Sequence, residues 1–284
     1  MADQESIWMY DPSFPLAVIG TVVYGITFLV LAYLTLIKYR AWFFIVVVVG
    51  SAIEVAAYNL RVYSAKNQSE ITPFVLTLTC TVLAPVLIAA GNYLLISRLI
   101  LAVLPPSHHR ILKIPGQRLT PIFVACDVIA FLIQGSGSGI ASSDNWQGEM
   151  EKIGVKVLVA GLSFQLVAFS LFLCVFRRFH VLAGRMAVDN APTGWRKVVL
   201  AVYISSILIM VSIRCVFRVV EFAGGRDSYA FIHEWPFWVF ESLPMVGAIG
   251  IFCIYHPSRY LGSHGPRFRA VCAEDTVELA EGRK

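Results

Sequence analysis

Long apolar runs separated by short polar segments dominate the sequence. A helix needs about 20 residues to cross the ~30 Å hydrocarbon core of a bilayer. Seven runs are long enough, at residues 15–37, 42–63, 73–101, 120–141, 153–176, 197–222 and 235–255. They are too long and too uniformly apolar for the strands of a membrane barrel. The pattern therefore predicts an all-α, polytopic integral membrane protein built as a seven-transmembrane helix bundle.

The composition agrees with this class. Of the 284 residues, 57% are hydrophobic and 14% are charged, whereas soluble domains carry roughly a quarter charged residues. Five of the six cysteines lie inside apolar runs and no CxxC pair occurs, so no disulfide framework, metal site or cofactor is expected. The bilayer is an expected partner. Nucleic acid is not an expected partner, and protein partners stay open.

The distribution of Lys and Arg predicts the orientation. Basic residues gather in segments 38–41, 104–119, 177–197 and 256–284, whereas the opposite side holds only Lys66, Lys152, Lys156 and Arg226. Cytoplasmic loops carry the excess of Lys and Arg in membrane proteins. The N-terminus is therefore expected outside and the C-terminus in the cytoplasm.

Three parts of the chain follow from this topology. Residues 1–14 are expected to form an extracellular tail, residues 15–255 the transmembrane domain, and residues 256–284 a disordered cytoplasmic tail. The acidic start lacks the basic region of a cleaved signal peptide. Asn67 begins an Asn-Gln-Ser sequon in a predicted outer loop, which makes it the expected glycosylation site. The plasma membrane is the expected location, with an endomembrane as the alternative.

Charged residues inside the apolar runs are the main candidates for function. The runs contain four basic residues, Arg61, Arg98, Arg214 and Arg218, and four acidic residues, Glu54, Asp127, Glu221 and Glu241. A charge in hydrocarbon costs several kcal/mol unless it is paired or hydrated. The equal numbers therefore indicate pairing within the bundle.

The spacing of these residues places them on single helix faces. Two triplets are spaced at i, i+4 and i+7, and two pairs lie seven apart: Glu54–Tyr58–Arg61, Arg214–Arg218–Glu221, Asp127–Gln134 and Glu234–Glu241. Residues at this spacing share one side of a helix. Each set is expected to face the bundle interior or a watery cavity rather than lipid.

Depth predicts where these faces meet. At ~1.5 Å per residue, Glu54 lies roughly 18 Å from the inner end of its helix. The second, fourth, sixth and seventh helices are predicted to converge on an outward-facing polar pocket, with Gln165 as its floor and His233 in its outer half. A structural salt-bridge network that fixes the helix packing is the alternative interpretation.

Specific ion pairs are predicted from the same depths. Arg214 and Arg218 are expected to neutralise Glu54 and Glu241, and Glu221 is expected to pair with Arg61.

Other motifs lead to simpler interpretations. The stretch QGSGSG at 134–139 lacks the Lys-Ser/Thr of a phosphate-binding loop, so a close helix contact or an unwound helix end is expected there. Arg98 is expected to extend its head group toward the inner interface. His256 is expected to act as a cation at the carboxyl end of the last helix. No set of His and acidic residues shares a helix face, so a zinc hydrolase has little support.

Several blocks of the sequence resemble one fungal family. They are YDPS, GSAIEVAAYNLR, LAPVLIAAGNY, DVIAFLIQGSGSG, GLSFQLVAF, IRCVFRVVE, HEWPFWVFE and YHPS, in order between about residues 10 and 260. This series is similar to the lipid-translocating exporter family, the RTA-like proteins named for resistance to aminocholesterol. The chain differs mildly at Ala57, Glu241 and Ser258, where Gly, Asp and Gly are usual, and the first two changes bear on the substrate more than on the family.

The resemblance implies seven membrane helices and a role in moving sphingoid long-chain bases, sterol-like compounds or other toxic amphiphiles. The positions that match the family motifs, together with Glu241, are the candidate ligand-binding residues: Glu54, Tyr58, Arg61, Asp127, Gln134, Gln165, Arg214, Arg218, Glu221, His233, Glu234 and Glu241. No catalytic residue is expected, and the protein is not expected to be an enzyme. A seven-helix lipid sensor is the alternative function, and an intramembrane lipid hydrolase is the third.

Overall fold

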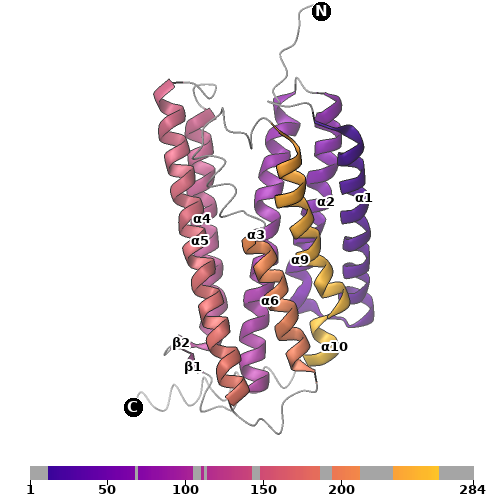
Figure 1. The fold of residues 1–284 in the computed structure, drawn as a ribbon, viewed down its shortest axis with the longest axis vertical. Coiled ribbons are helices and arrows are strands. Elements are labelled where there is room, and N and C mark those ends of the chain that lie inside the picture. The colour runs from indigo at the N-terminus through magenta and orange to yellow at the C-terminus, as the bar shows by residue number, and fades with distance from the viewer. Residues whose placement is uncertain are drawn as a thin grey trace, which may run out of the picture.

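A computed structural model describes residues 12–67, 70–104, 110–111, 114–142, 148–185, 194–211 and 233–261. These residues form a bundle of long helices that run side by side (Figure 1). The first described half consists of α1 (Phe14–Ala32), the π-helix η1 (Tyr33–Lys38), the short 3-10 helix η2 (Trp42–Phe44), α2 (Ile45–Lys66) and α3 (Ile71–Val103). Pro15 stands in the first turn of α1, where its missing N–H costs no helical hydrogen bond.

The remaining elements follow a small hairpin at the end of α3. Strands β1 (Arg110–Ile111) and β2 (Ile114–Pro115) pair antiparallel. After them come α4 (Gly116–Ser142), α5 (Gly148–Arg185), α6 (Trp195–Val211), the π-helix η4 (Phe237–Ser242), α9 (Leu243–Ile254) and α10 (Pro257–Leu261). The first and last described residues lie at opposite ends of the bundle (Figure 1).

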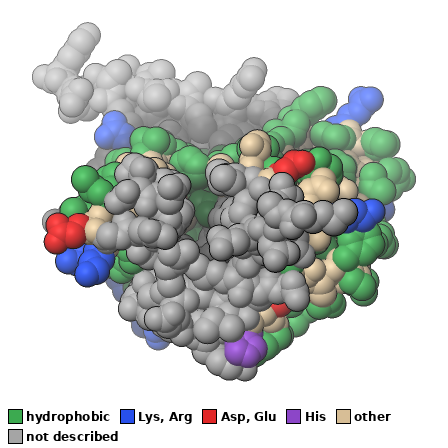
Figure 2. Space-filling view, turned by 90° about the horizontal axis from the view of Figure 1, so that it is seen from above, with side chains coloured by type: hydrophobic (Ala, Val, Ile, Leu, Met, Phe, Trp, Pro, Cys, Tyr) green, Lys and Arg blue, Asp and Glu red, His purple; other side chains and the backbone are tan. Residues whose placement is uncertain are grey.

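The helical, membrane-spanning class is confirmed. Six helices among the described residues are long and apolar enough to cross a membrane, and they correspond to the predicted spans other than the sixth. The sixth predicted span, 197–222, coincides with α6 up to Val211, and its remainder lies outside the described residues. Figure 2 looks onto one end of the bundle and shows hydrophobic side chains around much of the described periphery, as expected of helices that face lipid.

One helix extends beyond its predicted span. The fifth span was expected to end at residue 176, before a pair of arginines, but α5 continues to Arg185. The apolar spacing explains the extension, because Phe176, Phe179 and Ala183 lie three and four residues apart and are all buried. The basic residues occupy the other faces of the same helix, so a charge run did not end it.

Helix α3 lies at the centre of the fold. In Figure 1 it stands between the α4–α5 pair on one side and α1 and α2 on the other, with α6 and α9 nearby. Its buried Tyr93 packs against Phe123 of α4 and Phe172 of α5, with ring centroids 5.4 and 4.7 Å apart. Buried aromatic pairs of this kind add ~0.5–1.5 kcal/mol each beyond their area. They link the α4–α5 pair to the rest of the bundle.

Glycine allows α4 and α5 to pack at backbone distance. A Cβ atom on Gly154 would lie 2.5 Å from the backbone nitrogen of Ala141 and 2.6 Å from the carbonyl oxygen of Gly137. A Cβ on Gly137 would lie 2.7 Å from the nitrogen of Leu158. The close helix contact expected for the QGSGSG stretch is therefore confirmed at Gly137, and the helix continues through the stretch to Ser142.

The end of the last span differs from the prediction. His256 was expected as a cation at a helix end, but it is 2% exposed. Its Nε2 atom lies 3.1 Å from the hydroxyl of Thr35 in η1, and its ring stacks on Tyr39 at 4.9 Å. The backbone of His256 accepts a hydrogen bond from Arg259 at the start of α10. This residue therefore joins the break between α9 and α10 to the end of the first helix.

Candidate functional site

A small cavity lies among α1, α2, α3 and the last span. It is lined by Tyr24, Glu54, Tyr58, Thr81, Pro85, Glu241 and Met245, and its volume is about 10 Å³. A cavity of this size holds about one water molecule. Two carboxylates and two phenol rings therefore meet in a space that has no room for a head group in this conformation.

The tyrosines form one wall of the cavity. Tyr24 and Tyr58 stack with ring centroids 4.5 Å apart and an angle of 22° between the planes. The hydroxyl of Tyr24 donates a hydrogen bond of 2.8 Å to the backbone carbonyl of Ser242, at the end of the π-helix η4. This bond fixes α1 against the last span beside Glu241, the carboxylate that η4 contributes to the cavity.

The carboxylates come from different helices. Glu54 on α2 is 3% exposed and Glu241 on η4 is 8% exposed. Both belong to apolar segments that can cross a membrane, so each carboxylate lies in a desolvated setting that favours partners of positive charge. Pro85 of α3 also lines the cavity. Because proline has no N–H, it cannot donate the usual helical hydrogen bond to the carbonyl of Thr81 one turn earlier.

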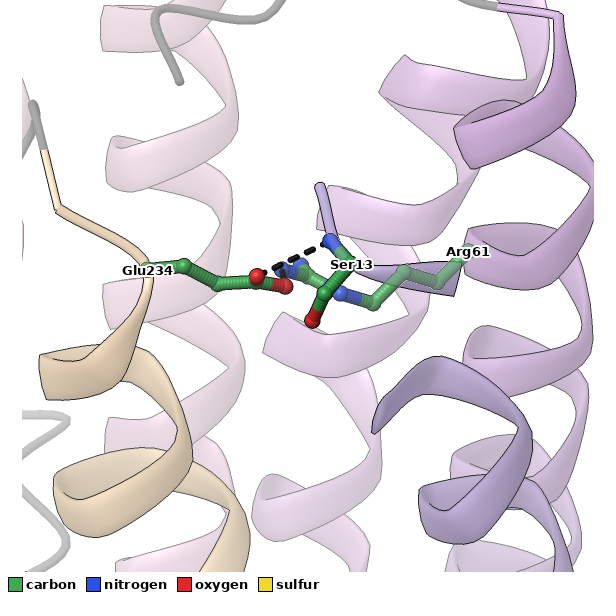
Figure 3. Close-up of polar contacts among 3 residues, drawn as sticks. All are labelled: Ser13, Arg61 and Glu234. Carbon is green, nitrogen blue, oxygen red and sulfur yellow. Dashed lines mark hydrogen bonds and ion pairs between the residues drawn. The ribbon is translucent and has the colours of Figure 1, made fainter. Parts of the chain in front are cut away.

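A second polar cluster lies nearer the end of the bundle where α1 begins. A nitrogen of the Arg61 guanidinium lies 3.1 Å from Oε1 of Glu234, and the backbone N–H of Ser13 donates to Oε2 of the same carboxylate at 2.9 Å (Figure 3). The guanidinium carbon of Arg61 lies 4.0 Å from the ring centroid of Phe237 and 5.5 Å from that of Trp238. We call these five residues the end cluster.

The end cluster adjoins the cavity. The rings of Trp238 and Tyr58 are 5.7 Å apart between centroids, and Tyr58 lines the cavity. Along α2, Arg61 stands seven residues beyond Glu54, which is two turns or about 10 Å. The ion pair therefore lies about two turns from the cavity carboxylate on the same face of the helix.

Contacts with the end cluster lower the pKa of Glu234. Partial burial raises this pKa, but hydrogen bonds from the Ser13 backbone and the Arg61 guanidinium outweigh burial, so the pKa lies below its ordinary value of 4.5. The charged form of Glu234 is thus favoured, which is the form that an ion pair requires.

Three other predicted residues form contacts elsewhere. The amide nitrogen of Gln134 on α4 donates to the amide oxygen of Gln165 on α5 at 2.9 Å. Asp127 accepts a hydrogen bond of 2.9 Å from the hydroxyl of Tyr93. None of these residues is among those that line the cavity. Gln165, predicted as the floor of the pocket, does not line this cavity and instead bonds Gln134 between α4 and α5.

The structure confirms the predicted burial of the charged and polar stripes. The two stripes Glu54–Tyr58–Arg61 and Asp127–Gln134 are buried along their whole length, and so is Glu241. Arg61 binds Glu234, a partner that was not predicted, and its expected pairing with Glu221 lies outside the described residues. Glu221, Arg214 and Arg218 lie outside the described residues, as do the pairings expected for these two arginines.

The remaining predicted positions are simpler. His233 is half-buried next to Glu234, and Asn67 follows α2 with its backbone N–H bonded to the carbonyl of Tyr63. The guanidinium of Arg98 lies 3.7 Å above the ring of Phe43, so this arginine rests on an aromatic face near the end of α3.

Sequence reasoning missed several residues that the structure brings to the site. They are Tyr24, Thr81, Pro85 and Met245 at the cavity and Ser13, Phe237 and Trp238 in the end cluster. A proline inside a span was a usable signal for Thr81 and Pro85, since it marks irregular backbone in a membrane helix. The aromatic residues carried no signal, because such residues are also common where helices meet the membrane interface.

Comparisons with known proteins give one family. The family model described as RTA1 like protein matches residues 47–264. Protein RTM1 of Saccharomyces cerevisiae is 33% identical over 214 residues, which cover 74% of this chain and 66% of that protein. A protein of Emericella nidulans named as a probable lipid transporter, atnI, is 29% identical over 95% of this chain and 72% of its own length.

A third relative has a more specific name. The sphingoid long-chain base transporter RSB1 of Saccharomyces cerevisiae is 24% identical over 269 residues, which cover 83% of this chain and 69% of that protein. The chain thus spans roughly two thirds of the length of these curated relatives. No solved structure matches the chain.

Proposed function

Because this chain belongs to the RTA1-like family, we propose that it moves amphiphilic lipids across a membrane and so protects the cell from them. Relatives named as a probable lipid transporter and as a sphingoid long-chain base transporter support this function. We also propose that the protein acts as a carrier and not as an enzyme, since these names are names of transporters.

The cavity is the observation that supports the proposal most directly. It combines Glu54 and Glu241 with the stacked rings of Tyr24 and Tyr58 inside the membrane-spanning part of the bundle. Carboxylates attract a cation by charge, and aromatic faces attract it by their quadrupole. An amphiphile with an amine head group fits this chemistry, as a sphingoid long-chain base does. The apolar surfaces of the surrounding helices suit its hydrocarbon chain.

Transport through this site requires movement. With a volume of about 10 Å³ the cavity admits a water molecule but no amine-bearing head group. We therefore interpret the structure as a closed conformation, in which the head group site is collapsed around its two carboxylates. The same cavity would also suit a lipid sensor, which needs a binding site but no continuous route across the membrane. Sensing is thus the second candidate function.

A liposome assay separates the two functions. The purified protein is reconstituted, and the passage of a fluorescent sphingoid base across the bilayer is measured against protein-free liposomes. We expect faster passage with the protein, and loss of the increase in Glu54→Gln and Glu241→Gln, which keep the shape of the side chain but cannot ionise. Glu149→Gln is the matched control, since this carboxylate is exposed at the start of α5. Binding without passage would identify a sensor, and neither binding nor passage would reject both functions for this lipid.

We propose that the protein lies in the plasma membrane. The excess of Lys and Arg on one side supports an orientation with the N-terminus and Asn67 outside and the C-terminus in the cytoplasm. An impermeant thiol reagent added to intact cells should label Lys66→Cys and leave Ala270→Cys unlabelled. Labelling of position 270 alone would reverse the orientation.

A further inference from the structure

The end cluster adjoins the cavity on the side where α1 begins. Ser13 precedes α1, Arg61 lies near the end of α2, and Glu234 precedes η4, so the cluster joins three separate parts of the chain (Figure 3). The aromatic pair Phe237 and Trp238 lies against the guanidinium of Arg61. The first helix, the second helix and the last span are thereby held together beyond the cavity.

The packing beneath the ion pair is tight. A Cβ atom on Gly20 of α1 would lie 2.8 Å from the ring of Tyr58 and 2.9 Å from the ring of Trp238. Gly20 thus allows α1 to lie directly on the two rings. Tyr58 lines the cavity on the other side of this contact. Trp238 therefore contacts both Arg61 of the ion pair and Tyr58 of the cavity wall.

The ion pair is built so that it can open. The Arg61 side chain is 3% exposed, but that of Glu234 is 13% exposed and therefore touches solvent. Glu234 lies at a bend of the backbone before the last span, so its carboxylate can leave by rotation of the side chain while the helical backbone stays in place. The stacking of Arg61 on Phe237 does not involve the carboxylate of Glu234.

We propose that the end cluster is the gate of the cavity, and that release of Glu234 from Arg61 and Ser13 lets Trp238 move and opens the site. The cargo admitted by this gate follows from the proposed function, an amphiphile with a cationic head group. Such a head group would approach Glu234 first and then the cavity carboxylates. Glu234 is thus a positioning residue that controls entry, whereas Glu54 and Glu241 bind.

Accessibility of the cavity tests the gate without any lipid. The six native cysteines are replaced, and Thr81→Cys is introduced as a reporter, because Thr81 lines the cavity and is 5% exposed. A water-soluble maleimide is added on the membrane side where Ser13 lies. We expect slow labelling in the parent and labelling several times faster with Glu234→Gln, which keeps the shape of the side chain and removes its charge.

Matched variants keep the result interpretable. Met245→Cys is a second cavity reporter on a different helix, for use if Thr81→Cys does not fold. Ala130→Cys on α4 is a fully buried reporter away from the cavity lining, and Glu149→Gln is the charge control. Faster labelling at the cavity reporters alone, caused by Glu234→Gln alone, supports the gate. Unchanged cavity labelling, or equal acceleration at position 130, overturns it.

The outcome is independent of the lipid assay. A protein that moves no lipid but shows the expected labelling has this gate and lacks the proposed function. A protein that moves lipid with unchanged labelling has the function, and its cavity opens elsewhere.

Discussion

The two sides of α3 are held together in different ways. On the cavity side, α1, α2 and the last span meet through an ion pair, hydrogen bonds and stacked rings around Glu54 and Glu241. On the other side, α4 and α5 meet backbone to backbone at Gly137 and Gly154, with one neutral amide pair nearby. Side-chain contacts can exchange partners, but glycine contacts cannot without separating the helices. We infer that the cavity side moves against a rigid α4–α5 pair.

The largest expected effect comes from breaking the rigid side. Gly154→Leu would place its Cβ 2.5 Å from a backbone nitrogen, so α4 and α5 must separate along the contact. Overpacking in well-packed sites costs about 1–3 kcal/mol or more, and we expect the upper end here because the obstacle is backbone. The yield of folded protein and its melting temperature in detergent measure the effect. Gly139→Leu is the control, since nothing lies within 4 Å of a Cβ at that position. Equal losses in both variants would refute the contact.

A smaller loss is expected from removing the cation of the end cluster. Breaking a fully buried ion pair costs about 3–5 kcal/mol. Because Glu234 is partly exposed, Arg61→Ala should cost about 2 kcal/mol in the free energy of unfolding. Thermal unfolding in detergent measures this loss. Lys152→Ala, which removes an exposed basic residue of α5, should change stability by less than about 0.5 kcal/mol. If the two variants were equally stable, Arg61 would not contribute through the pair.

Acid should weaken the cavity side and not the α4–α5 pair. The folded pKa of Glu234 lies below its ordinary value of 4.5. Its contribution to stability is therefore complete above that value and is lost as the pH falls through the folded pKa. Melting temperatures of the parent should fall between pH 5 and pH 3 by more than those of Glu234→Gln, since the variant has no proton to gain at this position. Parallel curves for the two proteins would show that the carboxylate is unimportant for the pH dependence.

The smallest effect on transport is expected at the amide pair. Changing Gln134 or Gln165 alone to Leu leaves the other amide buried without its partner, which costs about 1–3 kcal/mol. The double variant removes both polar groups and should recover most of the loss. Passage of the sphingoid base per folded molecule should stay unchanged in all three variants. If passage of the sphingoid base were lost while the variants still folded, these glutamines would have a role in transport as well as in packing.

Sequence reasoning could identify helices and buried faces but not neighbours. The spans followed from apolar length, and the stripe from Glu54 to Arg61 had to face inward because hydrocarbon tolerates no unpaired charge. Which helix stands opposite a stripe depends on tertiary packing, which a single sequence does not contain. Arg61 was therefore paired with a residue of similar depth inside a span, whereas its partner Glu234 lies just before one.

The π-helical turns of η1 and η4 affect how relatives should be compared. A π-helical turn holds more residues than an α-helical one and arises where a helix gains a single residue. A relative with a regular helix in place of η4 would need a one-residue gap in its alignment with this chain. Without that gap, every aligned position beyond the turn would be rotated by about 100°. The residue of the relative that is aligned with Glu241 would then be one that points away from the cavity. Substrate preferences inferred from that alignment would be assigned to the wrong side chain.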